Sequence, residues 1–174
     1  MRKALAAGAA GAVVGGVPST LWALARGRDP IEATLAAGSL LLPHETRRGR
    51  LLAAAVPVHI ALSLGWAVVL ERVLPRGRER ALGAMAGLAI AALDLGVVGR
   101  RFPRMRALPL LPQVADHVAY ALTVGEVLRT ARASAGAGGT HASSSGCRRA
   151  ASSTTSPSGW ASSRRTPSGS SDTP

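Results

Sequence analysis

The sequence predicts an all-α protein: a bundle of four transmembrane helices, one short interfacial or re-entrant helix and a disordered C-terminal tail. Two observations lead to this fold class. Hydrophobic residues make up 47% of the 174 residues although the formal net charge is +12, and soluble domains rarely combine the two. The apolar residues also fall in four blocks that arginine clusters separate, which is typical of a multi-pass protein of the plasma membrane.

The first apolar block, residues 4–25, predicts a membrane-spanning helix. A secretory signal cleaved after Ala25 is the alternative, but the block is longer than the apolar core of a signal peptide. Pro18 should kink the helix, with Ser19 and Thr20 helping to satisfy the freed carbonyl group. Small residues at three- and four-residue spacing predict a packing seam on one face: Gly8, Ala12, Gly15 and Ser19.

Three further blocks, residues 51–70, 81–99 and 110–128, each have the length of one membrane crossing. The stretch 30–42 is too short to cross and predicts an interfacial or re-entrant helix, which Asp29 caps and Pro30 begins. The transmembrane domain therefore covers residues 1–129. Residues 130–174 are rich in Ser, Gly and Arg without apolar periodicity, and we expect them to be disordered.

The third block carries a second seam of small residues, Gly83, Gly87 and Ala91, and Asp94 continues the same helical face. Asp94 should therefore point toward a packed neighbouring helix and away from lipid. In the fourth block, Gln113, Asp116, His117 and Tyr120 lie within roughly a hundred degrees of arc.

Ionisable side chains are costly inside a membrane unless they face one another. Because four short-looped spans alternate in direction, His59, Asp94, Asp116 and His117 fall at similar depths. We expect Asp94 to approach His59 or His117. The candidate intramembrane binding cluster comprises His59, Ser63, Asp94, Gln113, Asp116, His117 and Tyr120, of which Ser63, Gln113 and Tyr120 supply further hydrogen bonds.

Three functions fit this cluster. It can handle a proton or a small solute, because His and Asp side chains in a polar pocket form a relay. It can instead only join helices, in a structural or partner-binding membrane subunit without transport or catalysis. As a lesser alternative, His59 and His117 on facing helices could ligate haem b.

Several other functions are not indicated. The sequence has no phosphate-binding loop, no zinc-protease motif and no cysteine pair, so we expect neither an enzyme nor a bound metal or cofactor. Cys147 is the only cysteine. Basic residues flank apolar segments and few aromatic residues accompany them, so nucleic acid is not an expected partner. The expected partners are the lipid bilayer and either a second copy of the chain or another membrane protein.

Four runs of residues resemble small integral membrane proteins of bacteria with GC-rich genomes, a group of four-helix proteins without an assigned activity. The resemblance covers residues 1–129 and implies the membrane fold but no mechanism. The runs are Gly16–Leu21, Val56–His59, Leu93–Pro103 and Pro112–His117.

Overall fold

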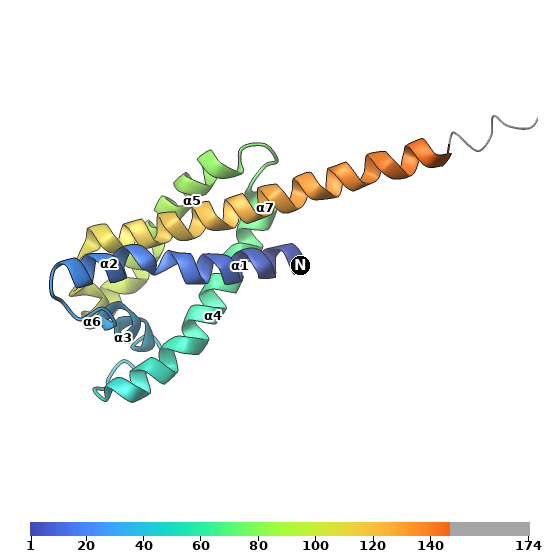
Figure 1. Cartoon of the computed structure of the whole chain (residues 1–174). Helices are drawn as coiled ribbons and strands as arrows, with labels where there is room; N and C mark the ends of the chain where they lie inside the picture. Colours follow the sequence, from blue (N-terminus) through green and yellow to red (C-terminus); the bar gives the residue numbers. More distant parts are fainter. Residues whose placement is uncertain (147–174) are drawn as a thin grey trace, which may run out of the picture. The chain divides into compact units, whose positions relative to one another are not determined.

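A computed structural model describes the backbone of residues 1–146 and the side-chain exposure of residues 1–135. The chain divides into two units, Met1–Ala137 and Gly138–Pro174. All regular structure in the described residues is helical, as predicted (Figure 1). The α-helices are α1 (Arg2–Gly15), α2 (Val17–Ala25), α3 (Glu32–Gly38), α4 (Arg48–Val73), α5 (Glu79–Leu93), α6 (Pro103–Arg106) and α7 (Leu110–Gly146).

Three stretches of helix in the described residues are long and apolar enough to cross a membrane: Arg2–Ala25, Arg48–Val73 and Glu79–Arg101. They correspond to the first three predicted spans. The fourth predicted span forms the first half of α7 but is not among these three. Its polar side chains, among them Gln113, Asp116 and His117 of the candidate cluster, lower its mean hydropathy.

The disturbance predicted from Pro18 takes the form of a one-residue interruption at Gly16, which divides the first span into α1 and α2. Pro18 has no N–H group for the carbonyl of Val14, and the N–H group of Gly16 bonds that carbonyl instead. The hydroxyl groups of Ser19 and Thr20 were expected to satisfy the carbonyl that Pro18 frees, but both donate to Gly16 O, at 3.4 and 2.7 Å. The break therefore leaves backbone groups of two helix ends inside the first span.

The buried face of this span differs by one position from the predicted seam. Gly11 is buried, whereas Ala12 is only partly buried. A Cβ atom on Gly11 would lie 2.7 Å from the ring of Tyr120, so α7 approaches α1 at this glycine. The buried residues of α1 and α2 are Ala4, Ala7, Gly8, Gly11, Gly15, Ser19 and Ala23.

The short helix α3 occupies the middle of the predicted stretch 30–42 and packs on α4. Gly38 faces the backbone of Leu51 so closely that a side chain there would clash. Helix α4 is longer than predicted at both ends and continues through Pro57. An ion pair between Arg48 and Asp29 at 2.5 Å joins the first residue of α4 to the loop before α3.

The helical geometry of the third span changes at Asp94, a residue of the candidate cluster. Helix α5 ends at Leu93, a π-helical turn covers Asp94–Val98 and a 3-10 turn covers Gly99–Arg101. The predicted seam is confirmed, since Gly83, Gly87 and Ala91 are all buried. A Cβ atom on Gly87 would lie 2.7 Å from Val118 Cα, so the backbones of α5 and α7 are in direct contact.

Helix α7 extends beyond the predicted end at 128, so residues 130–135, which were expected to be disordered, are helical. This stretch contains several alanines and no proline, so nothing in it stops a helix. Residues 147–174 of the predicted disordered tail lie outside the described residues.

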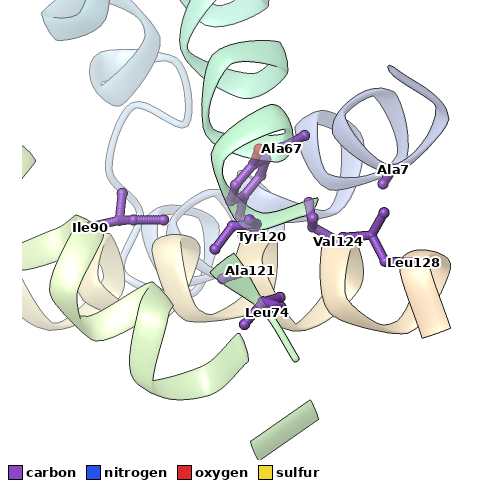
Figure 2. Close-up of a cluster of buried hydrophobic side chains, with 9 residues drawn as sticks. Ala7, Ala67, Leu74, Ile90, Tyr120, Ala121, Val124 and Leu128 are labelled. Atoms are coloured by element: carbon purple, nitrogen blue, oxygen red, sulfur yellow. The ribbon is translucent and has the colours of Figure 1, made fainter. Parts of the chain in front are cut away.

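The core joins α1, α4, α5 and α7 (Figure 2). Small residues let the helices approach, and a few large side chains on α7 fill the space that remains. In Figure 2, Tyr120 lies close to Ala67 of α4, while Val124 and Leu128 extend toward Ala7 of α1. The buried cluster comprises Ala7, Ala67, Leu70, Leu74, Ile90, Tyr120, Ala121, Val124 and Leu128.

Candidate functional site

Asp116 on α7 meets the start of α2. Its Oδ1 accepts a hydrogen bond of 2.8 Å from the backbone N–H group of Ser19. The first N–H groups of a helix have no partner inside the helix, and the positive end of the helix dipole favours a carboxylate there. Asp116 therefore satisfies one side of the break at Gly16.

His59 on α4 meets the other side of the break. Its Nε2 lies 3.0 Å from the carbonyl oxygen of Ala12, in the last turn of α1. A carbonyl oxygen can only accept, so Nε2 carries the proton and donates it. The two helix ends thus each bind a polar side chain of the type that suits them: a donor at the carbonyl end and a carboxylate at the N–H end.

His117 and Asp94 contact each other between α7 and the π-helical turn. His117 Nδ1 donates to the carbonyl oxygen of Gln113 at 2.7 Å, and Nε2 lies 3.3 Å from Asp94 Oδ2. Both side chains are about one-fifth exposed. A π-helical turn is a rare, strained geometry often found at functional sites, and here it begins at Asp94 itself.

The bonding of His117 fixes how many protons the pair holds. Because Nδ1 already donates to Gln113 O, a hydrogen bond to Asp94 needs one further proton on either Nε2 or the carboxylate. The pair is then either an imidazolium with a carboxylate or a neutral imidazole with a carboxylic acid. If the proton leaves, the lone pair of Nε2 faces a negative carboxylate, which is unfavourable. In this geometry the contact therefore holds one proton between Nε2 and the carboxylate.

Tyr120 lies at the centre of the packing. Its side chain is buried between α1 and α4, and its hydroxyl group donates to the carbonyl oxygen of Ser63. Gly11 and Gly15 provide the space, because a Cβ atom on either would lie within 3.0 Å of Tyr120. Ser63 and Gln113 thus contribute backbone carbonyl oxygens to these hydrogen bonds, where side-chain groups were expected.

The predicted residues do not form one mutual cluster. Asp94 meets His117, but no hydrogen bond or ion pair among the described residues links His59 to either of them. The polar groups instead form separate contacts with neighbouring helices. The side chain of His59 is exposed, although its spacing predicted an inward-facing position. Most partners of the candidate residues are main-chain atoms, which no residue pattern reveals.

One ionic site was missed by the sequence reasoning. Glu79 is 2% exposed and accepts from Arg132 Nη1 at 2.9 Å and from the N–H group of Gly77 at 2.7 Å. Arg132 also donates to the carbonyl oxygens of Glu71 and Leu74 at the end of α4. The contact was not predicted because Arg132 was assigned to a disordered tail. Its four-residue spacing from the buried Leu128 could have indicated that it lies on the same helical face.

Next to this site, Glu126 on α7 binds two arginines. Its carboxylate lies 2.6 Å from Arg80 Nε and 2.6 Å from Arg129 Nη2. Together with the Glu79–Arg132 contact, these ion pairs join α7 to the beginning of α5.

A cavity of about 320 Å³ lies between α2, α3 and the beginning of α7. Ser19 and Gln113 line it, and these two residues also bond Asp116 and His117 through their backbones. The cavity is therefore one residue away from both Asp116 and His117. Its lining comprises Ser19, Trp22, Ala23, Arg28, Asp29, Pro30, Glu32, Ala33, Ala107, Leu108, Pro109, Pro112 and Gln113.

Within the described residues, no group of three or more His, Cys, Asp or Glu side chains has an arrangement that could hold a metal ion. Haem ligation would need one ring nitrogen of each histidine, but both nitrogens of His117 are in hydrogen bonds. Comparison of the chain with protein-family models, curated proteins and solved structures found no match.

Proposed function

We propose that this chain is a multi-pass membrane protein of four spans that exchanges protons at the contact between Asp94 and His117. The observation that carries the proposal is the hydrogen bonding of His117, which requires one proton shared with Asp94. Gln113, whose carbonyl oxygen accepts from His117, lines the cavity that Asp29 also lines. No covalent chemistry is needed.

The distribution of side-chain sizes supports the membrane part of the proposal. In α1 and α2 the buried residues are small, while large apolar side chains point outward, for example Val13 at 76% exposed and Leu21 at 60%. The third span repeats this, with Met85 at 66%. Large apolar groups outside and small ones inside are typical of helices that pack in lipid.

The position of α7 supports a fourth span. Gly11 and Gly15 of α1 contact its residue Tyr120, and Gly87 of α5 contacts the backbone of His117 and Val118. A helix that packs along two membrane-spanning helices lies at the same depth in the bilayer. Its polar side chains are then sheltered by the neighbouring helices, as intramembrane ionisable groups require.

A structural subunit is the second candidate, because a specific observation favours it. The carboxylate of Asp116, the ring of His59 and the hydroxyl group of Tyr120 all bond backbone groups. Such contacts join helices without moving a proton, and each typically contributes less than ~2 kcal/mol.

Proton flux separates the two candidates. The full-length protein is reconstituted in liposomes that contain a pH-sensitive dye, and a pH step is applied outside. Proton exchange predicts flux above that of empty liposomes, which Asp94→Asn and His117→Gln abolish. His44→Gln, which changes an exposed loop histidine, is the matched control and should keep the flux.

Two results would count against proton exchange. The first is a wild-type flux equal to that of empty liposomes. The second is unchanged flux in both variants together with a lower melting temperature, which is the outcome expected of a structural subunit.

A further inference from the structure

The cavity between α2, α3 and α7 contains two charged side chains of opposite sign without a partner in the protein. Among the described residues, neither the side chain of Arg28 nor that of Glu32 forms a hydrogen bond or ion pair with another side chain or backbone group. The third charged residue of the lining, Asp29, is already paired with Arg48 at 2.5 Å. The cavity therefore offers one guanidinium group and one carboxylate to a ligand.

The remaining walls suit an organic molecule. Trp22, Leu108 and the prolines of the lining form apolar surface, and Gln113 and Ser19 add neutral polar groups. Ligand sites usually combine a mostly apolar lining with a few polar groups that fix orientation. Arg28 stacks on the ring of Trp22 at 5.5 Å, and this stacking leaves the N–H groups at the edge of the guanidinium plane free to donate.

We propose that this cavity binds a small zwitterion, such as a free α-amino acid. The ligand carboxylate would meet Arg28, its ammonium group would meet Glu32, and its side chain would pack against Trp22. The volume of about 320 Å³ is at the lower end of the range for ligand sites, which favours a molecule of amino-acid size. A ligand with a single net charge would leave either Arg28 or Glu32 without a partner.

The proposal goes beyond proton exchange and does not depend on it, because binding needs only the cavity. The two sites are nevertheless neighbours. Ser19 and Gln113 line the cavity and bond Asp116 and His117, so an occupied cavity would alter the surroundings of both ionisable groups.

Binding is tested with the full-length protein in lipid nanodiscs, without a proton gradient, so the result is independent of the flux assay. Thermal unfolding in the presence of each common amino acid at millimolar concentration identifies the best ligand. Calorimetry then compares this amino acid with its methyl ester, which is only cationic, and its N-acetyl derivative, which is only anionic. The zwitterion should bind more tightly than either.

Two pairs of matched variants locate the site. Arg28→Gln and Glu32→Gln should each weaken binding roughly tenfold to a hundredfold, the effect expected of removing a hydrogen bond to a charged group. Arg26→Gln is the control for the first, because Arg26 also stacks on Trp22 at 5.5 Å but does not line the cavity. Glu45→Gln is the control for the second, because Glu45 lies in the loop before α4. Both controls should keep the affinity.

Three results would overturn the proposal. The first is that no amino acid binds to the wild-type protein. The second is that the methyl ester or the N-acetyl derivative binds as tightly as the zwitterion. The third is that the cavity variants bind no more weakly than their controls.

Discussion

The close approach of α5 and α7 at Gly87 makes a sharp prediction about stability. In Gly87→Ala the new Cβ atom would lie 2.7 Å from Val118 Cα and 2.8 Å from His117 O. Both are backbone atoms of a helix and cannot rotate away, so the two helices must separate. Such overpacking typically costs about 1–3 kcal/mol, and the higher helix propensity of alanine offsets about 1 kcal/mol of it.

Gly65→Ala is the matched control. Gly65 also lies inside a helix, α4, but its new Cβ atom would have no other atom within 4 Å. The control should gain about 1 kcal/mol from helix propensity alone. Gly87→Ala should therefore be about 1–3 kcal/mol less stable than Gly65→Ala, since the propensity gain is common to both.

The free energy of unfolding is measured by denaturant titration of the purified protein in lipid–detergent micelles. Equal stabilisation in both variants would refute the close packing of α5 on α7, because alanine at residue 87 would then fit without displacement. The same result would refute the placement of His117 against the third span, because His117 O is one of the two atoms in contact.

Three further predictions follow from single contacts. Asp116→Ala should lower the free energy of unfolding by about 0.5–2 kcal/mol, because the Ser19 N–H group loses its acceptor. Asp116→Asn keeps an oxygen and should lower the free energy of unfolding less. Equal losses in the two variants would contradict the contact. Arg132→Gln should lower the melting temperature, because it leaves the buried Glu79 carboxylate without a partner. Adding Glu79→Gln to the same chain should restore part of the lost stability. A double variant no more stable than Arg132→Gln alone would contradict the pairing. The Ile31 N–H group and Arg48 hold the pKa of Asp29 in the folded protein below its usual value. Asp29→Asn should therefore lower the melting temperature at neutral pH but not at a pH below that pKa. A difference in melting temperature that does not depend on pH would contradict the ion pair.

The sign of the last prediction follows from linkage. A carboxyl group with a lowered pKa in the folded state stabilises the protein above the pKa of the unfolded state. This contribution is lost as the pH falls through the lower, folded-state pKa of Asp29. Wild type and Asp29→Asn should therefore converge in acid, where the wild-type carboxyl group is also neutral.

Much of the helix packing could be predicted from the sequence. Small residues at helical spacing identified the face of α5 that contacts α7, and Asp94 was expected to approach one of two histidines. On α1 the predicted seam included Gly15, which faces Tyr120, but missed Gly11. These inferences depend on spacing and residue size, which the sequence states directly. The alternation of four short-looped helices also suggested that Asp94 and His117 lie at a common depth.

Other features depended on atoms that a residue pattern does not show. The break at Gly16 exposes backbone groups, and His59 and Asp116 bond those groups in preference to one another. The spacing of His59 could show its helical face but not that Ala12 O would be its partner. The extension of α7 was missed because a low-complexity composition was taken to exclude a helix, and Arg132 was lost with it.

The central claim is that Asp94 and His117 share one exchangeable proton. Its most direct test is ¹⁵N nuclear magnetic resonance of the His117 ring in the full-length protein in bilayers, followed from acid to alkaline pH, with His117→Gln assigning the signal. The account predicts that Nδ1 stays protonated while Nε2 titrates, and that Asp94→Asn shifts the midpoint of this titration to lower pH. A midpoint that Asp94→Asn leaves unchanged, or ring nitrogens that do not titrate at all, would contradict it.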